Sequence, residues 1–168
     1  NVDLSDEHIA KVYFKVEDCY FFIVISIDIQ SLSPTWAYVE QASSVSLIIS
    51  SNLIDIDLLK NIINITPDEI ETIGETNGKR IYDSNSISFV NNKFNPGTVE
   101  NKLLFMSNIL LNNKSRIIDC EDKIDIIISI AYYGHISWMN GIHIDKSLFN
   151  GFNITFDIDL YAEGDKRI

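Results

Sequence analysis

The clearest pattern along the chain is an alternation of apolar and polar residues near its C-terminal end, from Phe152 to Tyr161. Every second residue there is apolar, and the positions between them hold Asn153, Thr155, Asp157, Asp159 and Tyr161. A period of two is typical of a β-strand with one buried face, because successive side chains of a strand point to opposite sides of the sheet. We therefore predict a half-buried strand over 152–161 with one acidic face.

Other alternating or apolar runs predict further strands. In the run from Tyr20 to Ile29, the isoleucines and Phe21 fall on one face. The segment 123–133 places isoleucines and Tyr132 on one side and mixes Asp125 with small and apolar residues on the other, as in a central strand that is partly covered on both faces. The predicted strands are 11–16, 20–29, 36–40, 45–50, 86–90, 123–133 and 152–161.

Two segments have the spacing of three and four residues that is typical of amphipathic helices. The first covers 54–64 and ends before Pro67, and the second covers 98–112 with Thr98 as its cap. Their apolar positions are Ile54, Leu58, Leu59, Ile62 and Ile65 in the first helix and Val99, Leu103, Met106 and Leu110 in the second. The polar stretch 68–85 predicts a flexible loop, and 145–149 predicts a helical turn.

Together these elements predict an α+β fold, a mostly antiparallel sheet with two main helices packed on one face. The 168 residues fit one hydrophobic core, and no repeat or low-complexity linker divides them, so we expect a single domain over 1–168. The sequence leaves open whether Cys19 and Cys120 pair, although a domain of this size does not need the bridge.

The chain carries 24 acidic and 13 basic residues, a net charge of −11. Direct binding of nucleic acid is not expected, because phosphate contacts need clustered Lys and Arg, and no basic run here is longer than a pair. A basic protein is the partner that this charge favours. The apolar runs are shorter than the roughly 20 residues of a membrane helix, and we expect no signal peptide, because no basic segment with a small-residue cleavage site opens the chain. We therefore expect no membrane span and a cytoplasmic location.

Two groups of residues could carry chemistry. Asp157 and Asp159 lie about 7 Å apart on one strand face, which would suit metal binding or acid-base catalysis, although a solvated polar face is the simpler interpretation. His135, His143 and Asp145 match none of the strong histidine signatures of metal sites. We expect no catalytic residue, no metal and no cofactor, and hence not an enzyme, although a hydrolase built from the two aspartates and a histidine stays open.

The stretch from Val45 to Tyr161 resembles an uncharacterised bacterial family, one of the domains of unknown function. Four segments carry this resemblance: Ile56 to Pro67, the pair Gly74-Glu75, Gly141 to Leu148, and Phe156 to Tyr161. They match the family in pattern and contain no catalytic motif. The resemblance implies a fold in which a strand, a helical segment, a long helix and further strands follow one another.

A second resemblance concerns the whole composition. Small acidic α+β proteins rich in Asn, Ile and Ser are similar to the immunity proteins of bacterial toxin systems, including contact-dependent growth inhibition. This resemblance implies an antitoxin that binds and neutralises a basic toxin domain, a nuclease, by charge complementarity and by β-augmentation. The expected contact residues are Asp125, Asp157 and Asp159 on the sheet and Glu69, Glu71 and Glu75 in the polar loop. The alternative is a small-ligand or regulatory binding domain, with its ligand near His135, Trp138 and His143.

Overall fold

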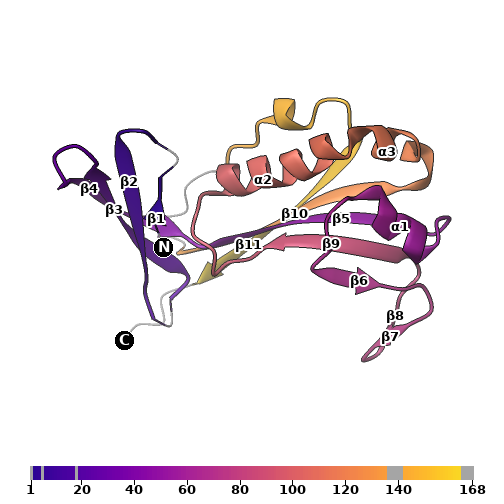
Figure 1. The fold of residues 1–168 in the computed structure, drawn as a ribbon. Coiled ribbons are helices and arrows are strands. Elements are labelled where there is room, and N and C mark those ends of the chain that lie inside the picture. Colours follow the sequence, from indigo (N-terminus) through magenta and orange to yellow (C-terminus); the bar gives the residue numbers. More distant parts are fainter. Residues whose placement is uncertain (1, 5, 18, 136–141, 164–168) are drawn as a thin grey trace.

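The main body of the protein is a five-stranded sheet covered by helices on one face (Figure 1). The structure is a computed structural model and describes residues 2–4, 6–17, 19–135 and 142–163. The strand order is β11 (Ile154–Glu163), β10 (Asp125–His135), β5 (Ser43–Ser51), β9 (Asn85–Asn91) and β6 (Glu69–Glu71). Neighbouring strands are antiparallel except β10 and β11, which run parallel. The predicted α+β fold with a mostly antiparallel sheet is confirmed.

The helices α1 (Ile56–Ile62) and α2 (Val99–Asn112) contribute to one core with the sheet, and the short helix α3 (Lys114–Ile118) follows α2. Two 3₁₀ turns complete this layer, η1 (Glu121–Lys123) and η2 (Lys146–Phe149). Asp55 caps α1 by accepting the Asp57 N–H, and for this reason the helix begins two residues later than predicted. The fully buried core residues come mainly from β5, α2 and β10: Val45, Leu47, Ile49, Leu103, Met106, Leu110, Ile128 and Ile130.

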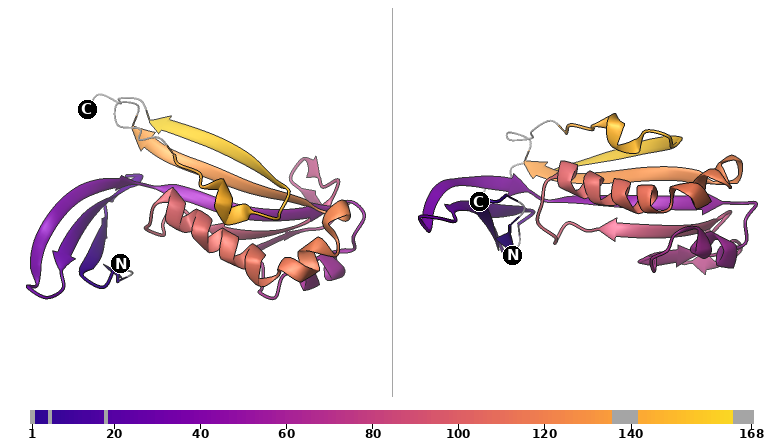
Figure 2. Two further views of the ribbon diagram at one scale, coloured as in Figure 1. Left: turned by 90° about the horizontal axis from the view of Figure 1, so that it is seen from above. Right: turned by 45° about the horizontal axis from the view of Figure 1, so that its top comes forward.

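A second, four-stranded sheet precedes the body in the chain and projects from one end of it (Figure 2). It is formed in sequence order by β1 (Val2–Asp3), β2 (Ile9–Lys15), β3 (Phe21–Asp28) and β4 (Ser33–Gln41), and we call it the arm. It has a small core of its own, with Tyr13, Phe22, Val24 and Ala42 buried and Tyr38 and Tyr133 packed against them. The prediction that residues 1–168 form a single domain stays a prediction.

Ala42 joins the arm to the body, because it alone separates β4 from β5. Its N–H donates to the Tyr20 carbonyl at 2.9 Å, and its carbonyl accepts the Tyr133 N–H at 3.0 Å. The side chain is buried. One residue therefore ties strands of both sheets together, and β4 and β5 form an almost continuous ribbon across the molecule (Figure 1).

The polar stretch 68–85, which we predicted to be a flexible loop, is partly ordered. It contains β6, at the edge of the main sheet, and a hairpin of β7 (Thr76–Asn77) and β8 (Arg80–Ile81). Gly78 forms the hairpin turn with φ of 62°, a backbone conformation that glycine adopts without steric cost. Strands of two or three residues are too short to show an alternating pattern, so pairing with neighbours decides them.

The last strand lies two residues later than predicted, over 154–163, and pairs parallel to β10. A parallel neighbour needs a crossover connection from the end of one strand to the start of the next. The described part of that connection carries η2, whose Phe149 is buried and contacts Phe156 edge-on at 5.6 Å between ring centroids. Among the described residues, no helix is both long and apolar enough to cross a membrane.

Candidate functional site

The face of the main sheet opposite the helices is made largely of serine and carboxylate side chains, and we call it the open face. Residues paired across neighbouring strands share a face, so the register defines its rows. One row runs through Asp125, Ser50, Ser86 and Glu71. The other rows join Thr155, Ile127, Ile48, Ser88 and Glu69; Asp157, Ser129, Ser46 and Val90; and Asp159, Ala131 and Ser44.

Five of the six predicted contact carboxylates therefore lie on the open face. Asp157 and Asp159 lie on the edge strand β11, and Asp125 lies at the start of β10. Glu69 and Glu71 lie on β6, the strand at the opposite edge, and not in a loop as predicted. Four strand spacings separate the two edges, about 19 Å. The carboxylates thus form two separated groups on either side of a serine-rich surface, a spacing that suits a macromolecule better than one small ligand.

Glu75, the sixth predicted contact residue, lies apart from the other five. It is exposed and precedes the β7–β8 hairpin. Its N–H donates to the Thr72 carbonyl at 3.0 Å, and its carbonyl accepts the Tyr82 N–H at 3.0 Å, so its backbone closes the base of the hairpin. The sequence pattern could not separate Glu75 from Glu69 and Glu71, because all three stand in one polar stretch.

The edge strand β11 is only partly the half-buried strand that its alternation predicted. Ile154 and Phe156 pack against the core, but Ile158 is 44% and Leu160 is 60% exposed. The helical layer does not extend over the second half of the strand, so its apolar face is not covered there. This half of β11 presents carboxylates on one face, apolar side chains on the other, and a backbone edge to which another strand could add.

A cluster of aromatic rings lies beside these carboxylates at the junction of the two sheets. Tyr133 stacks on Tyr161 with ring centroids 5.0 Å apart, and Tyr20 lies 5.2 Å from Tyr133. The ammonium group of Lys93 lies 4.2 Å from the Tyr20 ring and 4.8 Å from the Tyr133 ring, within the range of cation–π attraction. Sequence reasoning missed this cluster, because its residues come from four separate parts of the chain.

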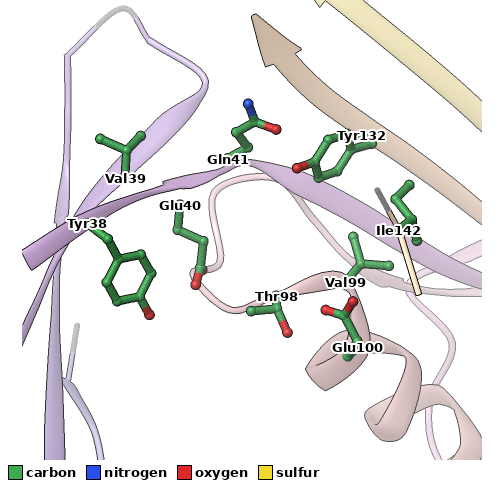
Figure 3. Close-up of a pocket in the computed structure, with 9 residues that line it drawn as sticks. All are labelled: Tyr38, Val39, Glu40, Gln41, Thr98, Val99, Glu100, Tyr132 and Ile142. Atoms are coloured by element: carbon green, nitrogen blue, oxygen red, sulfur yellow. The ribbon is translucent and has the colours of Figure 1, made fainter. Parts of the chain in front are cut away.

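A pocket of about 260 Å³ lies where the arm meets the N-terminus of α2, and we call it the junction pocket (Figure 3). Strand β4 supplies one wall, the first turn of α2 another, and Tyr132 with Ile142 a third. Thr98 caps α2 by accepting the Asn101 N–H, which fixes the first helical turn at the pocket. The lining residues are Tyr38, Val39, Glu40, Gln41, Thr98, Val99, Glu100, Tyr132 and Ile142.

Glu40 is the buried acid of the junction pocket. It is 7% exposed, one carboxylate oxygen accepts the Gly97 N–H at 3.0 Å, and the other oxygen has no hydrogen-bond partner. Burial raises the pKa of this carboxyl, and the Gly97 N–H and the charges of Lys11 and Lys102 lower it only in part. Burial is the largest cause of the raised pKa of Tyr38, and the negative charge of Glu40 is the second. Burial and the charge of Glu100 raise the pKa of Tyr132 more than the charge of Glu40 does.

Lys102 is buried next to this site, in a second hollow of about 350 Å³ that also contains Asp3, Tyr13 and Gly97. Its ammonium group donates to the Ser43 carbonyl and, at 3.1 Å, to the Asn92 carbonyl. Burial lowers the pKa of Lys102 to about 8, against the opposing effect of Glu40. One sequence signal could have found it: Lys102 stands beside Leu103 within the apolar stripe of α2. Nothing in the sequence around Glu40 marks its burial.

The histidine and cysteine positions form no metal centre in the part of the chain that the structure describes. Asp145 instead caps η2, where it accepts from the Ser147 hydroxyl at 2.6 Å and from the Ser147 N–H at 2.9 Å, and these two contacts lower its pKa. His143 is exposed, and its backbone N–H donates to a Glu100 carboxylate oxygen at 3.4 Å. The side chain of His135 and all of Trp138 lie outside the described residues. Cys19 and Cys120 are free thiols.

No curated protein and no solved structure matches the chain. One family, described as a domain of unknown function, DUF4279, matches residues 40–163, which agrees with the resemblance predicted for 45–161. The match begins at Glu40, so it contains the whole main sheet, both main helices and the junction pocket's helical wall, and it leaves out nearly all of the arm. The chain therefore belongs to the DUF4279 family of domains of unknown function.

Proposed function

We propose that this protein is an immunity protein that binds a basic bacterial toxin domain, a nuclease, and neutralises it without catalysing a reaction. The observation that carries the proposal is that Asp125, Asp157, Asp159, Glu69 and Glu71 all lie on one face of the main sheet, the open face. The similarity to immunity proteins noted from the sequence supplies the class of partner. The proposed site of action is the cytoplasm, where a nuclease meets its substrate.

Charge complementarity is the proposed physical basis of binding. A nuclease contacts phosphates through clustered Lys and Arg, and a chain with a net charge of −11 attracts such a surface over several ångströms. Opposed charges of this kind raise the association rate and select the partner. Ser44, Ser46, Ser50 and Ser129 lie between the two carboxylate groups and are partly exposed. Their short side chains can donate and accept hydrogen bonds, so a flat partner surface can approach the sheet closely.

The exposed edge of β11 is a second proposed contact. A partner strand added there would gain backbone hydrogen bonds, and alternating basic and apolar side chains would match Asp157 and Asp159 on one face and Ile158 and Leu160 on the other. The two proposed modes of binding, charge attraction on the open face and strand pairing at the sheet edge, thus both use β11. The carboxylates of β6 would then orient the partner across the sheet.

The first test is co-expression with the product of the neighbouring upstream gene, followed by purification of any complex and a salt titration of its affinity. We expect a one-to-one complex that abolishes the toxic activity and weakens as salt screens the charges. The triple variant Asp125→Asn, Asp157→Asn, Asp159→Asn should weaken binding about tenfold or more at low salt, chiefly through slower association.

The matched control removes three exposed carboxylates elsewhere, Glu7→Gln, Asp119→Asn and Asp122→Asn, and changes the net charge by the same amount. If the control variant loses as much affinity as the open-face variant, general attraction and not the open face accounts for binding. The absence of both a complex and a toxic neighbour would contradict the immunity function itself.

The junction pocket favours a second candidate, a small-ligand or regulatory binding domain. The sequence predicted such a ligand near His135, Trp138 and His143, and the backbone N–H of His143 donates to Glu100, which lines the pocket. A thermal-shift screen of metabolites in the absence of any toxin tests this candidate. Stabilisation that is lost on changing Glu40 would favour it over the toxin inhibitor.

A further inference from the structure

The junction pocket combines buried negative charge with aromatic walls. Glu40 and Glu100 are both carboxylates, and Tyr38 and Tyr132 bring two aromatic rings (Figure 3). In Figure 3 the Glu40 side chain extends from β4 towards the chain segment that carries Thr98 and Glu100. Of the described residues that line the pocket, none is Lys, Arg or His. The pocket thus has negative charge without a cation inside it.

One oxygen of the Glu40 carboxylate accepts a hydrogen bond, and the other oxygen does not. The Gly97 N–H holds one oxygen at 3.0 Å, while the other oxygen is buried and accepts no hydrogen bond. A buried carboxylate without its full set of partners carries a free-energy cost that a bound donor would remove. The raised pKa of Glu40 agrees with this, because nearby positive charges do not offset the loss of water.

The charges of Lys11 and Lys102 both act on Glu40, but neither side chain donates to its second carboxylate oxygen. Lys102 donates to the carbonyls of Ser43 and Asn92, and it lines the neighbouring hollow and not the junction pocket. Lys102 therefore reduces the negative potential at Glu40 without pairing with its free oxygen. The second oxygen of Glu40 is thus left without a hydrogen-bond donor from the described part of the chain.

We infer that the junction pocket binds a protonated organic amine or guanidinium group, with its N–H donors directed to the carboxylates of Glu40 and Glu100 and its positive charge beside the rings of Tyr38 and Tyr132 that line the pocket. Cations are attracted to the faces of aromatic rings, and this attraction increases where water is excluded. A volume of about 260 Å³ has room for roughly nine water-sized groups, enough for such a head group and a short alkyl stem.

A metal ion is a poorer match to the same site. Calcium takes six to eight oxygen ligands, and magnesium requires a near-octahedral set. The described residues contain no group of three or more His, Cys, Asp or Glu side chains that could hold a metal. A planar or tetrahedral nitrogen cation needs fewer charged oxygens and uses the aromatic walls, which a hard metal ion does not.

The cation could belong to a free small molecule or to a Lys or Arg side chain of a bound protein, since both present the same chemistry. The inference does not depend on the toxin-inhibitor proposal, because the pocket lies at the arm junction and uses none of the open-face carboxylates. An experiment that contradicts one of these two proposals does not contradict the other.

The test is an NMR titration of the full chain with butylguanidinium and butylammonium chloride, with neutral butylurea as the matched control and magnesium chloride as the metal arm. We expect shift changes at Tyr38, Glu40, Thr98, Glu100 and Tyr132 with dissociation constants of about 0.1–10 mM, the range of good fragments of this size. Butylurea and magnesium should give none. Equal responses to butylurea, or responses to magnesium alone, would overturn the inference, as would no response to either cation.

Two variants establish the location. Glu40→Gln keeps an acceptor for the Gly97 N–H but removes the charge, and it should weaken cation binding at least about tenfold, whereas Glu7→Gln on the arm should have no effect. Ile142→Trp fills the pocket from the opposite wall and should abolish binding without changing any charge. Unchanged affinity in both variants would place the cation elsewhere and overturn the assignment.

A third arm separates the two sources. Arginine capped at both ends as an acetyl amide represents a protein side chain, and butylguanidinium represents a free molecule. Comparable affinities show that the pocket admits a cation carried on a backbone, which supports binding of a partner side chain. Loss of binding on capping supports a free small-molecule cation. Both results support the inferred chemistry and differ only in its source.

Discussion

At the scale of single residues, the fold buries two side chains of opposite charge at the arm junction. Glu40 and Lys102 are 7% and 2% exposed, and each is bonded to the backbone of another segment. Glu40 accepts a hydrogen bond from Gly97 in the loop before α2. Lys102 donates to Ser43 at the start of β5 and to Asn92 after β9. These two side chains therefore hold the start of α2 against the point where the two sheets meet, at the cost of burying their charges.

The lowered pKa of Lys102 leads to a prediction about stability at alkaline pH. The unfolded chain holds this proton up to the ordinary value of 10.5, whereas the folded chain releases it at about 8. Between these values the unfolded state binds more protons, so the free energy of unfolding should rise with pH, by up to about 3 kcal/mol in total. The Lys102→Met variant lacks this contribution.

Urea titrations of both proteins from pH 7.5 to pH 10.5 measure the effect. The difference in unfolding free energy between wild type and Lys102→Met should shift in favour of the wild type across this range, and tyrosine ionisation cancels because both proteins contain the same tyrosines. A difference that stays constant with pH would show that Lys102 titrates at its ordinary value.

At the scale of elements, α2 was the easiest to predict and β6 the hardest. The helix was predicted over 98–112 and is found over 99–112 with Thr98 as its cap. This prediction was accurate because the apolar stripe and the capping residue of a helix are both local signals in the sequence. β6 has three residues and is a strand only because it pairs with β9. The second half of β11 shows a related limit: its alternation predicted a strand correctly, but burial depended on a covering layer that no local pattern reveals.

The cap of α2 gives a prediction at this scale. Thr98→Ala removes the oxygen that accepts the Asn101 N–H and should lower the free energy of unfolding by about 1 kcal/mol, as measured by urea denaturation. Thr98→Ser keeps the oxygen and should retain most of the stability. The exposed Thr66→Ala is the control and should change stability by less than about 0.5 kcal/mol. Equal losses in Thr98→Ala and Thr98→Ser would show that the hydroxyl does not act as a cap.

At the scale of the whole molecule, uncompensated negative charge is the dominant property. The net charge is −11, and the ion pair of Lys60 with Asp57 lies on the surface, where such pairs contribute little. Repulsion between like charges destabilises a compact state, and salt screens it. The charge that would attract a basic partner therefore reduces the stability of the free protein.

Added salt should accordingly stabilise the free protein. Raising sodium chloride from about 10 mM to about 200 mM should increase the midpoint of thermal unfolding by a few degrees, corresponding to roughly 1 kcal/mol for a chain of this size. The open-face variant of Asp125, Asp157 and Asp159, with three fewer charges, should gain less. A midpoint that falls with salt, or an equal gain in the variant, would contradict this account of the open-face charge.

The sequence by itself determined the fold class, most of the longer strands, both main helices and the acidic balance, because each of these is a local or additive property of the residues. Periodicity also placed Asp157 and Asp159 on one face of a strand. Only the tertiary structure decided that Glu69 and Glu71 share that face of the sheet, that β11 runs parallel to β10, and that Glu40 and Lys102 are buried at the junction. The physical reason is that strand register and burial arise from contacts between segments far apart in the chain, and a local pattern carries no record of which segments meet.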